Sequence, residues 1–549
     1  MQVAGMQEKM ASNYRAVNVS FQNTEGAVRS AEATTAAIFN RTALPAGSLF
    51  SESAVSLDCA AFDAVEWGRA RSVTAAPEVK VRRIDSCGGD SAGNSNKMGG
   101  TIDTATSSYQ IEGAAHTDGR GPSIWDVFCK VEGKVANGDN GDVANDHYNR
   151  YPEDIAIMKE LGLQSYRFSF AWPRMFPQGS GAREERGFAF YDRLIDSLLE
   201  AKIEPLATLY HWDLPQALQE KGGWENRDTI KHFADYSAAV VERFGDRVKK
   251  FSPINEPWVV AWLGNGIGIH APGKKDRKAA WAVAHHTVVA HAASTMAMRS
   301  VRSDILTGPV LNQANNIPDD VNDSKQAYAV DVLDAVQNRF WMDAFMYGKY
   351  PQVLMDNFGD ELSAVIKDGD LEAATVKNDF IGINYYFDNR VGPAVEGLDQ
   401  WHSISSLFGA ASDETPRGPL TDMGWPLTPE GLENLLVRWH KEHGDKLPPL
   451  FITENGCAYG DGPGADGAVH DPKRIDYLQT HLKAVSNAIA QGSPVKGYYQ
   501  WSLMDNFEWA LGYEKRFGIV HVDFETQKRI IKDSGYWYRD QIKNNGSTI

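Results

Sequence analysis

The feature that most constrains the fold is a regular alternation of short apolar runs and amphipathic segments, which starts near residue 101. The apolar runs have the length of buried strands, and the intervening segments, such as 190–199, have apolar residues at helical spacing. Eight strands separated by helices predict an α/β fold, a closed (β/α)8 TIM barrel. The eight predicted strands are 104–110, 165–170, 204–210, 249–255, 304–312, 379–386, 449–454 and 495–502.

Most of these predicted strands end in a polar or titratable side chain. Packing gives a buried strand no reason to finish in this way, whereas barrel enzymes carry their functional groups at the carboxyl ends of the strands. We therefore expect these side chains to meet at one mouth of the barrel. They are Gln110, Arg167, His211, Glu256, Asn312, Tyr386 and Glu454. A helix is expected to open at Pro152 and to end at Gly162.

The composition changes near residue 98. Residues 1–97 are rich in Ala, Ser, Thr, Gly and Asn, show weak periodicity, and end in a Gly/Ser/Asn-rich run at 87–100. Such a run is typical of a flexible linker. We interpret 1–97 as an N-terminal extension, disordered or a targeting arm, and 98–549 as the catalytic barrel.

Bulk charge and cysteine content exclude several classes of protein. The net charge is −17, which argues against nucleic acid or an anionic membrane as a partner. The four cysteines are far apart, so neither a disulfide framework nor a zinc site is expected. The first residues lack the apolar core of a secretory signal, which favours a cytoplasmic protein, with organellar targeting as the alternative. Nothing in the sequence indicates an oligomeric state.

Two carboxylates carry the chemistry. Glu256 ends the fourth predicted strand and Glu454 ends the seventh, so the two lie on nearly opposite sides of a small barrel. Each ends an apolar strand and stands beside an Asn and a Pro or Gly, which is not the setting of a solvated surface charge. Two carboxyls that face each other across a mouth are the arrangement that acetal hydrolysis needs.

From Thr104 to the C-terminus the chain resembles glycoside hydrolase family 1, the β-glucosidases. Long motifs in the same order carry the resemblance. They are SSYQIEGA (107–114), GRGPSIWD (119–126), YRFSFAWPR (166–174), TLYHWDLPQAL (208–218), INEPW (254–258), INYY (383–386), FITENG (451–456) and WSLMDNFEWA (501–510). The resemblance implies a retaining β-glycosidase, most specifically a β-glucosidase, that acts on a small β-glycoside or oligosaccharide without a cofactor.

The resemblance also implies a role for each matched residue. Glu256 would be the acid/base and Glu454 the nucleophile. Arg167 and Tyr386 would orient the nucleophile and keep it ionised. Substrate would be bound by Gln110, His211, Trp212, Asn255, Tyr386, Trp425, Trp501, Glu508 and Trp509, with Trp425 on the leaving-group side.

Three alternatives stay open at this stage. A transglycosidase would use the same residues, and a non-catalytic glycan-binding relative would have lost one carboxylate, whereas both are present here. A metal on His285, His286 and His291 is disfavoured, because no HExxH motif is present and the family uses no catalytic metal.

One departure from the family concerns Asp103, a charged residue where Gly is expected in the first strand, which places the start of that strand in doubt.

Overall fold

The computed structural model describes residues 55–56, 81–82, 100–393, 399–412 and 418–546. The chain divides into two units, Met1–Lys97 and Met98–Ile549. In the first unit, the described residues form β1 (Val55–Ser56) and β2 (Val81–Arg82), which pair in parallel. The extension expected over 1–97 therefore lies almost wholly outside the described residues, and its nature stays a prediction.

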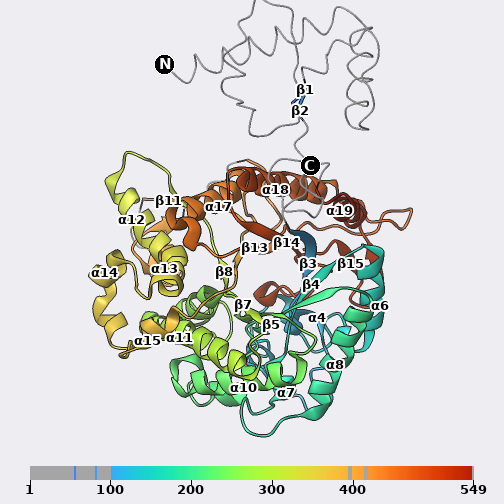
Figure 1. Cartoon of the computed structure of the whole chain (residues 1–549), viewed down its shortest axis with the longest axis horizontal. Helices are drawn as coiled ribbons and strands as arrows, with labels where there is room; N and C mark the ends of the chain where they lie inside the picture. The colour runs from blue at the N-terminus through green and yellow to red at the C-terminus, as the bar shows by residue number, and fades with distance from the viewer. Residues whose placement is uncertain (1–54, 57–80, 83–99, 394–398, 413–417, 547–549) are drawn as a thin grey trace, which may run out of the picture. The chain divides into compact units, whose positions relative to one another are not determined.

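The second unit is built on a parallel sheet that curls into a barrel (Figure 1). Its strands pair in the order β7-β6-β5-β4-β3-β14-β13-β10-β8. A parallel bridge joins Asn255, the residue after β6, to Val310 of β8, so the sheet closes into a barrel. The predicted (β/α)8 barrel is confirmed. The strands are β3 (Thr101–Ala105), β4 (Ser165–Ser169), β5 (Glu204–Tyr210), β6 (Lys250–Ile254), β7 (Leu306–Thr307), β8 (Val310–Asn312), β10 (Ile381–Asn384), β13 (Leu450–Asn455) and β14 (Val495–Trp501).

The fifth barrel strand is interrupted, so the continuous strand predicted over 304–312 is wrong. β7 pairs with β6 and β8 pairs with β10, and the chain passes from one neighbour to the other at Gly308 and Pro309. A Cβ atom at Gly308 would lie 2.2 Å from the Phe380 carbonyl oxygen, so only glycine fits. Pro309 has no N–H to donate to a ladder. These two residues break the strand where it changes partner.

The first barrel strand starts and ends earlier than expected. β3 is Thr101–Ala105, and the polar end expected at Gln110 belongs instead to the short helix α4 (Ser108–Ile111). Asp103 lies inside β3 and is fully buried. The backbone N–H groups of Gln164 and Ser165 donate to its Oδ1 at 2.9 and 2.7 Å. These bonds allow a carboxyl to occupy a strand position where its charge conflicts with the apolar surroundings.

Helices surround the barrel sheet (Figure 1). The longer ones are α6 (His147–Glu160), α8 (Glu185–Glu200), α10 (Asp228–Phe244), α11 (Arg277–Val301), α12 (Ser324–Asp334), α13 (Phe340–Tyr347), α14 (Gln352–Ser363), α17 (Pro429–His443), α18 (Pro472–Ala490) and α19 (Asp533–Asn544). Shorter helices are α5 (Ile124–Phe128), α7 (Trp172–Met175), α9 (Gln216–Gln219), α15 (Asp370–Ala374) and α16 (Ile404–Leu407). Further 3₁₀-helical segments lie at Ala136–Gly138, Gly223–Glu225, Gly444–Lys446 and Trp509–Leu511, and π-helical segments at Val259–Gly266 and Ala335–Arg339. Two small sheets contain β9 (Asn316–Pro318), β11 (Asn389–Gly392) and β12 (Ala411–Ser412), and β15 (Val520–Val522) and β16 (Arg529–Ile531).

The helix start expected at Pro152 is wrong. α6 begins at His147, and Pro152 lies inside it. Proline removes one backbone hydrogen bond from a helix interior, so other contacts must hold the extra turn. The buried His147 ring bonds the Asp154 carboxylate at 2.7 Å, and the Tyr148 N–H donates to the Glu112 carbonyl at 3.0 Å. Tertiary contacts therefore extend this helix beyond the start that proline indicates.

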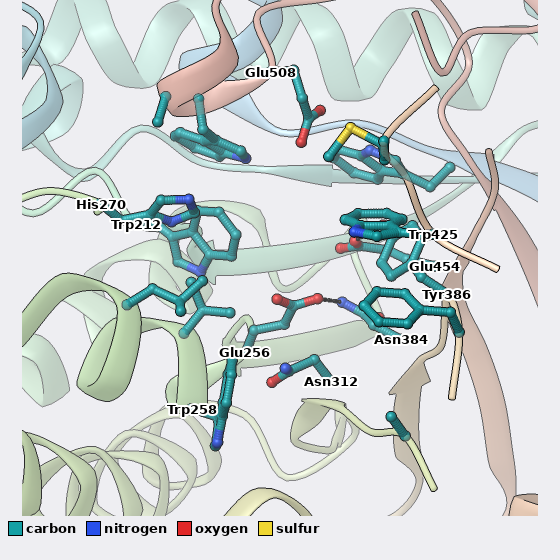
Figure 2. A pocket seen from close by; sticks show the side chains of 18 of the residues that line it. Trp212, Glu256, Trp258, His270, Asn312, Asn384, Tyr386, Trp425, Glu454 and Glu508 are labelled. Carbon is teal, nitrogen blue, oxygen red and sulfur yellow. Dashed lines mark hydrogen bonds between the residues drawn. The ribbon is translucent and has the colours of Figure 1, made fainter. Parts of the chain in front are cut away.

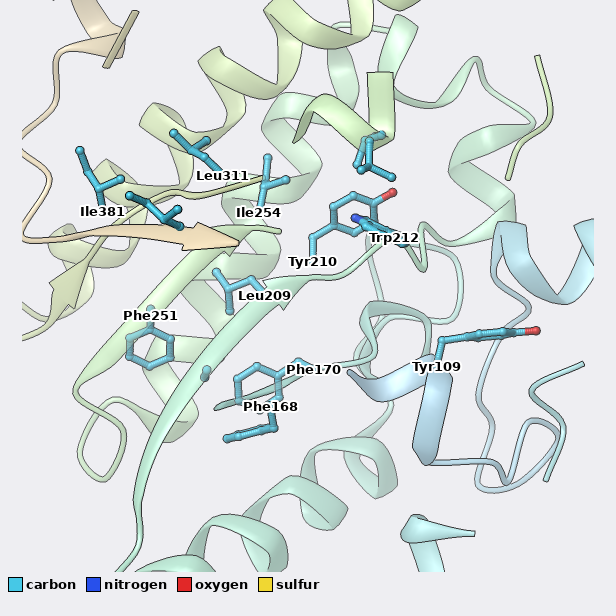
Figure 3. Close-up of a cluster of buried hydrophobic side chains, with 14 of the residues drawn as sticks. Tyr109, Phe168, Phe170, Leu209, Tyr210, Trp212, Phe251, Ile254, Leu311 and Ile381 are labelled. Carbon is cyan, nitrogen blue, oxygen red and sulfur yellow. The ribbon is translucent and has the colours of Figure 1, made fainter. Parts of the chain in front are cut away.

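Large apolar side chains fill the space around the strands (Figure 3). Phe168 and Phe170 of the β4 region pack edge-to-face at 5.2 Å, and Phe170 stacks on Phe244 of α10 at 5.3 Å. These contacts fix the outer helices against the strands that carry the polar ends. Cys129 and Cys457 are buried free thiols, whereas Cys59 and Cys87 lie outside the described residues. In the described part of the chain, every helix is too short or too polar to cross a membrane.

Candidate active site

A cavity of about 530 Å³ opens at the carboxyl ends of the barrel strands and contains both predicted carboxylates (Figure 2). Most of the predicted site residues line it, together with others that the sequence did not single out. The predicted ones are His211, Trp212, Glu256, Tyr386, Trp425, Glu454, Trp501, Glu508 and Trp509. Asn312, expected at this mouth as the polar end of a strand, also lines the cavity. The lining further includes Trp258, His270, Gln313, Gln337, Asn384, Phe387, Asn389, Met423 and Phe517.

Glu454 is held by a cation and a phenol. It lies near the end of β13, where the Arg167 guanidinium donates to its Oε1 at 2.6 Å and the Tyr386 hydroxyl donates to its Oε2 at 2.7 Å. Burial raises the pKa of Glu454, but Arg167 and Tyr386 oppose that shift because both stabilise the ionised form. The predicted pairing of Arg167 and Tyr386 with this carboxylate is therefore present in the structure.

Glu256 has no cation bonded to it among the described residues. The Asn384 amide donates to its Oε1 at 2.6 Å, and its backbone N–H donates to the Val310 carbonyl at 2.9 Å. Burial raises the pKa of Glu256 well above its usual value, and the charge of Glu454 adds to the shift. The two carboxyls thus differ: Glu454 loses its proton first, and Glu256 keeps its proton to higher pH.

Asn255 connects the nucleophile side of the site to His211. Its Oδ1 accepts from Arg167 at 2.6 Å and from Asn384 at 3.2 Å, which fixes the direction of the amide. The amide nitrogen therefore faces His211 Nε2 at 3.1 Å and donates to it. Burial holds the pKa of His211 well below its usual value, so the ring is neutral and carries its proton on Nδ1. That Nδ1 is buried and has no partner among the described residues, so it can donate to a ligand.

Aromatic rings form much of the cavity wall. Trp212 and Trp509 lie 4.5 Å apart, and the His211 ring stacks on Trp501 at 5.8 Å. On the other side of the site, Trp425 packs on Tyr386 at 5.3 Å (Figure 2). Flat rings of this kind suit the apolar face of a sugar ring.

Three of the site residues have backbone conformations that non-glycine residues rarely adopt. The φ angles of Trp212, Glu256 and Trp509 are 78°, 46° and 52°. Such conformations cost energy and persist only where the surrounding structure imposes them. The unfavourable backbone conformations of these three residues therefore lower the stability of the fold but direct the side chains into the cavity.

Glu508 and Gln110 behave differently from each other. Glu508 lines the cavity, and burial together with the charge of Glu454 raises its pKa to about 8. Gln110 is buried beside the cavity and is not among its lining residues. Its amide donates to Phe507 O at 2.8 Å and to Asn506 Oδ1 at 3.1 Å, so it supports the segment that carries Glu508.

The three clustered histidines of α11 have protein partners. His285 bonds Asp370 at 2.8 Å, His286 bonds the Trp224 carbonyl at 2.8 Å, and His291 bonds Asn378 at 2.8 Å. Across residues 100–393, 399–412 and 418–546, no group of three or more His, Cys, Asp or Glu side chains has a spacing that could hold a metal ion.

Asn384 is the main functional residue that sequence reasoning missed. It lies at the end of β10 within the INYY motif, two positions before Tyr386, and it bonds both Asn255 and Glu256. The sequence predicted a strand over 379–386, and residues two apart on a strand share one face, so the position of Tyr386 was a usable signal. Trp258 lies two residues after Glu256 in the INEPW motif. Its place in a motif that carries a predicted catalytic residue was also a usable signal.

Comparison with known proteins identifies the family of the chain. The family described as Glycosyl hydrolase family 1 matches residues 99–547. The chain belongs to that family. Beta-glucosidase A of Thermotoga maritima is 44% identical over 80% of this chain and 96% of its own length. A bifunctional beta-D-glucosidase/beta-D-fucosidase of Bifidobacterium breve is 41% identical over 81% of this chain and 97% of its own length.

A solved structure also matches the fold. Beta-glucosidase from Thermotoga maritima in complex with glucoimidazole aligns with a TM-score of 0.77 and covers 82% of this chain and 100% of its own. Family membership and this likeness make the chain a glycosidase, as the motifs predicted. The cavity that holds Glu256 and Glu454 is the candidate active site of this glycosidase.

Proposed function

We propose that this family member is a retaining β-glucosidase that removes terminal β-D-glucosyl residues by double displacement. One observation supports the assignment of one carboxyl as the nucleophile and the other as the acid/base. Glu454 is bonded by Arg167 and Tyr386, whereas Glu256 is bonded by the neutral amide of Asn384. An ionised carboxylate is the nucleophile that this reaction needs, and a protonated one is its acid.

In the first step, a Glu454 oxygen attacks the anomeric carbon and forms a covalent glycosyl-enzyme ester. The bond from that carbon to the leaving oxygen breaks, and Glu256 gives its proton to that oxygen. In the second step, a water molecule attacks the same carbon while Glu256 takes a proton from the water. The ester bond breaks, the sugar leaves with its β configuration, and Glu454 regains its charge.

The remaining residues bind the glucosyl group. Asn255 would bind the 2-hydroxyl of the sugar, and this hydrogen bond would strengthen in the transition state. His211 presents the free Nδ1–H described above, and Glu508 presents a carboxyl that can both donate and accept near neutral pH. Trp501 supplies a platform for the ring. Trp212, Trp509 and Gln110 complete the set, Gln110 through the segment that it supports.

The decisive experiment follows the configuration of the released sugar. Purified protein is mixed with p-nitrophenyl β-glucoside, and the anomeric protons are followed by NMR. The β-anomer should appear first, as expected for carboxyls about 5–5.5 Å apart. Initial release of the α-anomer would refute the mechanism. The corresponding β-galactoside and β-fucoside test the breadth of the sugar site, and absence of hydrolysis with all three would refute the function.

A further inference from the structure

A second, much smaller cavity adjoins the candidate active site. It has about 10 Å³ of space, enough for one water molecule. Trp212, Val259 and His270 line both this cavity and the large one, so they form the wall between the two. An occupant of the small cavity therefore contacts Trp212, a residue of the proposed glucosyl site, from outside that site. The other lining residues are Trp125, Tyr210, Val260 and Ala271.

Three of the lining residues carry a polar atom that has no hydrogen-bond partner among the described residues. These atoms are the Trp125 indole Nε1, the Tyr210 hydroxyl oxygen and His270 Nδ1. All three atoms are buried, and the Trp125 and Tyr210 side chains are fully enclosed. A buried polar group without a partner lowers stability, and in folded proteins such groups are nearly always paired with protein or with bound water. Three of them around one small cavity indicate a polar occupant.

The three residues come from separate segments that meet around this cavity. Trp125 lies in α5, Tyr210 ends β5, and His270 follows the π-helical segment Val259–Gly266. The His270 ring lies 5.4 Å from the ring of Trp125 and 5.4 Å from that of Trp212 (Figure 2). Tyr210 stands two residues before Trp212 at the end of β5 (Figure 3). One occupant bonded to all three residues would tie these segments together beside Trp212.

The chemistry of the lining favours water over an ion. An indole nitrogen only donates, so the occupant must accept from Trp125, which excludes a metal cation. Burial lowers the pKa of His270 to about 3, so its ring is neutral near pH 7. Every described residue that lines the cavity is then uncharged, which makes burial of an anion unfavourable. A water molecule can accept from Trp125 and pair with Tyr210 and His270, which gives the three bonds typical of buried water.

Trp212 has a conformation that needs such support. Its φ angle is 78°, and its indole N–H donates to the Asn255 carbonyl at 3.0 Å. A strained backbone persists only where the surrounding structure imposes it. The wall formed with His270 is therefore a place where a lost bond would let the Trp212 ring move.

We propose that the small cavity binds one water molecule, held by Trp125, Tyr210 and His270, and that this water positions Trp212 in the glucosyl site. Tyr210 and His270 are then positioning residues for the reaction. The effect on substrate rests on the proposed function, whereas the water site rests on the fold alone.

A high-resolution crystal structure of the full chain tests the site. One peak of solvent density is expected at hydrogen-bond distance, about 2.6–3.2 Å, from Trp125 Nε1, the Tyr210 oxygen and His270 Nδ1. If no density lies within that distance of the three atoms, the proposal is overturned. This measurement needs no variant, so it decides the site even where a variant fails to fold.

Tyr210→Phe tests the positioning role, because it removes the hydroxyl and keeps the ring. With p-nitrophenyl β-glucoside, KM should rise about threefold to tenfold while kcat stays within about twofold, since Trp212 would bind the glucosyl group equally in the ground state and the transition state. The matched control is Tyr350→Phe. It removes a buried hydroxyl that bonds His285 at 2.8 Å, outside the lining of both cavities. It should leave KM unchanged.

The possible failures are distinguishable. An unchanged KM in Tyr210→Phe, or an equal rise in Tyr350→Phe, would mean that the hydroxyl serves the fold alone and would overturn the positioning role. A wild type that does not hydrolyse the glucoside would refute the proposed function, whereas the solvent density would still decide the water site.

Discussion

Buried carboxyls lie toward opposite ends of the barrel strands, and their surroundings differ. At the carboxyl ends, Glu454 accepts from Arg167 and Tyr386. Near the start of β4, Asp103 accepts from two backbone N–H groups, and its Oδ2 has no partner among the described residues. Burial raises the pKa of Asp103 to about 6. The barrel provides a cation where the proposed mechanism needs a charged carboxylate, and backbone dipoles where it does not.

The largest effect is expected when the proposed nucleophile at the mouth of the barrel is removed. Glu454→Ala should lower kcat by ~10⁴-fold or more on every substrate, because no glycosyl-enzyme ester can form. Stopped assays with p-nitrophenyl and dinitrophenyl β-glucosides measure this loss. A Glu433→Ala variant, changed on α17 outside the cavity lining, is the control. Residual activity near the wild-type value would remove Glu454 from its role.

The second test separates the two carboxyls of the mouth. Glu256→Ala should lose ~10²–10⁴-fold on glucosides with poor leaving groups, because these need a proton in the first step. Dinitrophenyl glucoside needs no such proton, so its glycosylation step should be spared. Added azide should accelerate turnover, since it attacks the intermediate without a general base. The roles are wrong if azide has no effect and both substrates suffer equally.

The third test removes the cation that distinguishes Glu454 from Asp103. Arg167→Met should lower kcat/KM by ~10²-fold through lost positioning and electrostatic support. Arg167 lowers the pKa of Glu454, so its removal should raise that pKa. The nucleophile must be ionised, and the acidic limb of the kcat/KM profile should therefore move to higher pH. Arg183→Met, at an exposed ion pair with Glu242, should leave the profile unchanged.

The fourth test concerns the strand interior around Asp103. Its pKa is about 6 in the folded chain and 3.8 as a reference, so the native state binds more protons between these values. Stability from this group is present below about pH 4 and is lost as the pH rises through 6. Asp103→Asn should therefore be more stable than the wild type by ~1–3 kcal/mol at pH 7, with the difference vanishing near pH 4. Urea denaturation at both pH values measures it, and a constant difference would contradict the argument.

The smallest effect is expected upstream of β3. The composition of residues 1–97 predicts no part in catalysis and little in stability. A shortened chain that begins at Met98 should keep kcat/KM within about twofold and its Tm within ~2–4 °C, the shift that about 1 kcal/mol causes in a large domain. Activity assays and thermal melting of the two lengths decide this. An insoluble product, or a Tm ~10 °C lower, would show that the barrel depends on the upstream segment.

The sequence predicted most of the fold because strand periodicity and strand ends are local signals. It failed where tertiary contacts dominate. The polar end at Gln110 was assigned to a strand, although that segment turns into α4 after Ala105. The start of α6 was predicted at Pro152, whereas the helix begins at His147. The additional turn was missed because it depends on contacts with distant residues such as Glu112.

The motifs predicted the individual residues of the candidate site, but they did not predict the hydrogen bonds between those residues. Motifs identify Arg167, Asn255 and Glu454, but they do not reveal that one amide oxygen of Asn255 accepts from both Arg167 and Asn384. Asn312 was expected at the mouth as a strand end, whereas Gln313 was not. The amide atoms of these residues that lack a partner among the described residues can be recognised only in three dimensions.

The closure of the barrel at Asn255 and Val310 has a consequence for folding order. The backbone N–H of Glu256 donates to the Val310 carbonyl, so the seam between β6 and β8 contains the proposed acid itself. In a partly refolded chain, every other strand pair could be present while this seam is missing. Glu256 would then not be held opposite Glu454. Recovery of enzymatic turnover during refolding should therefore report the formation of this seam, and should lag behind the recovery of helical signal, because helices form from local contacts.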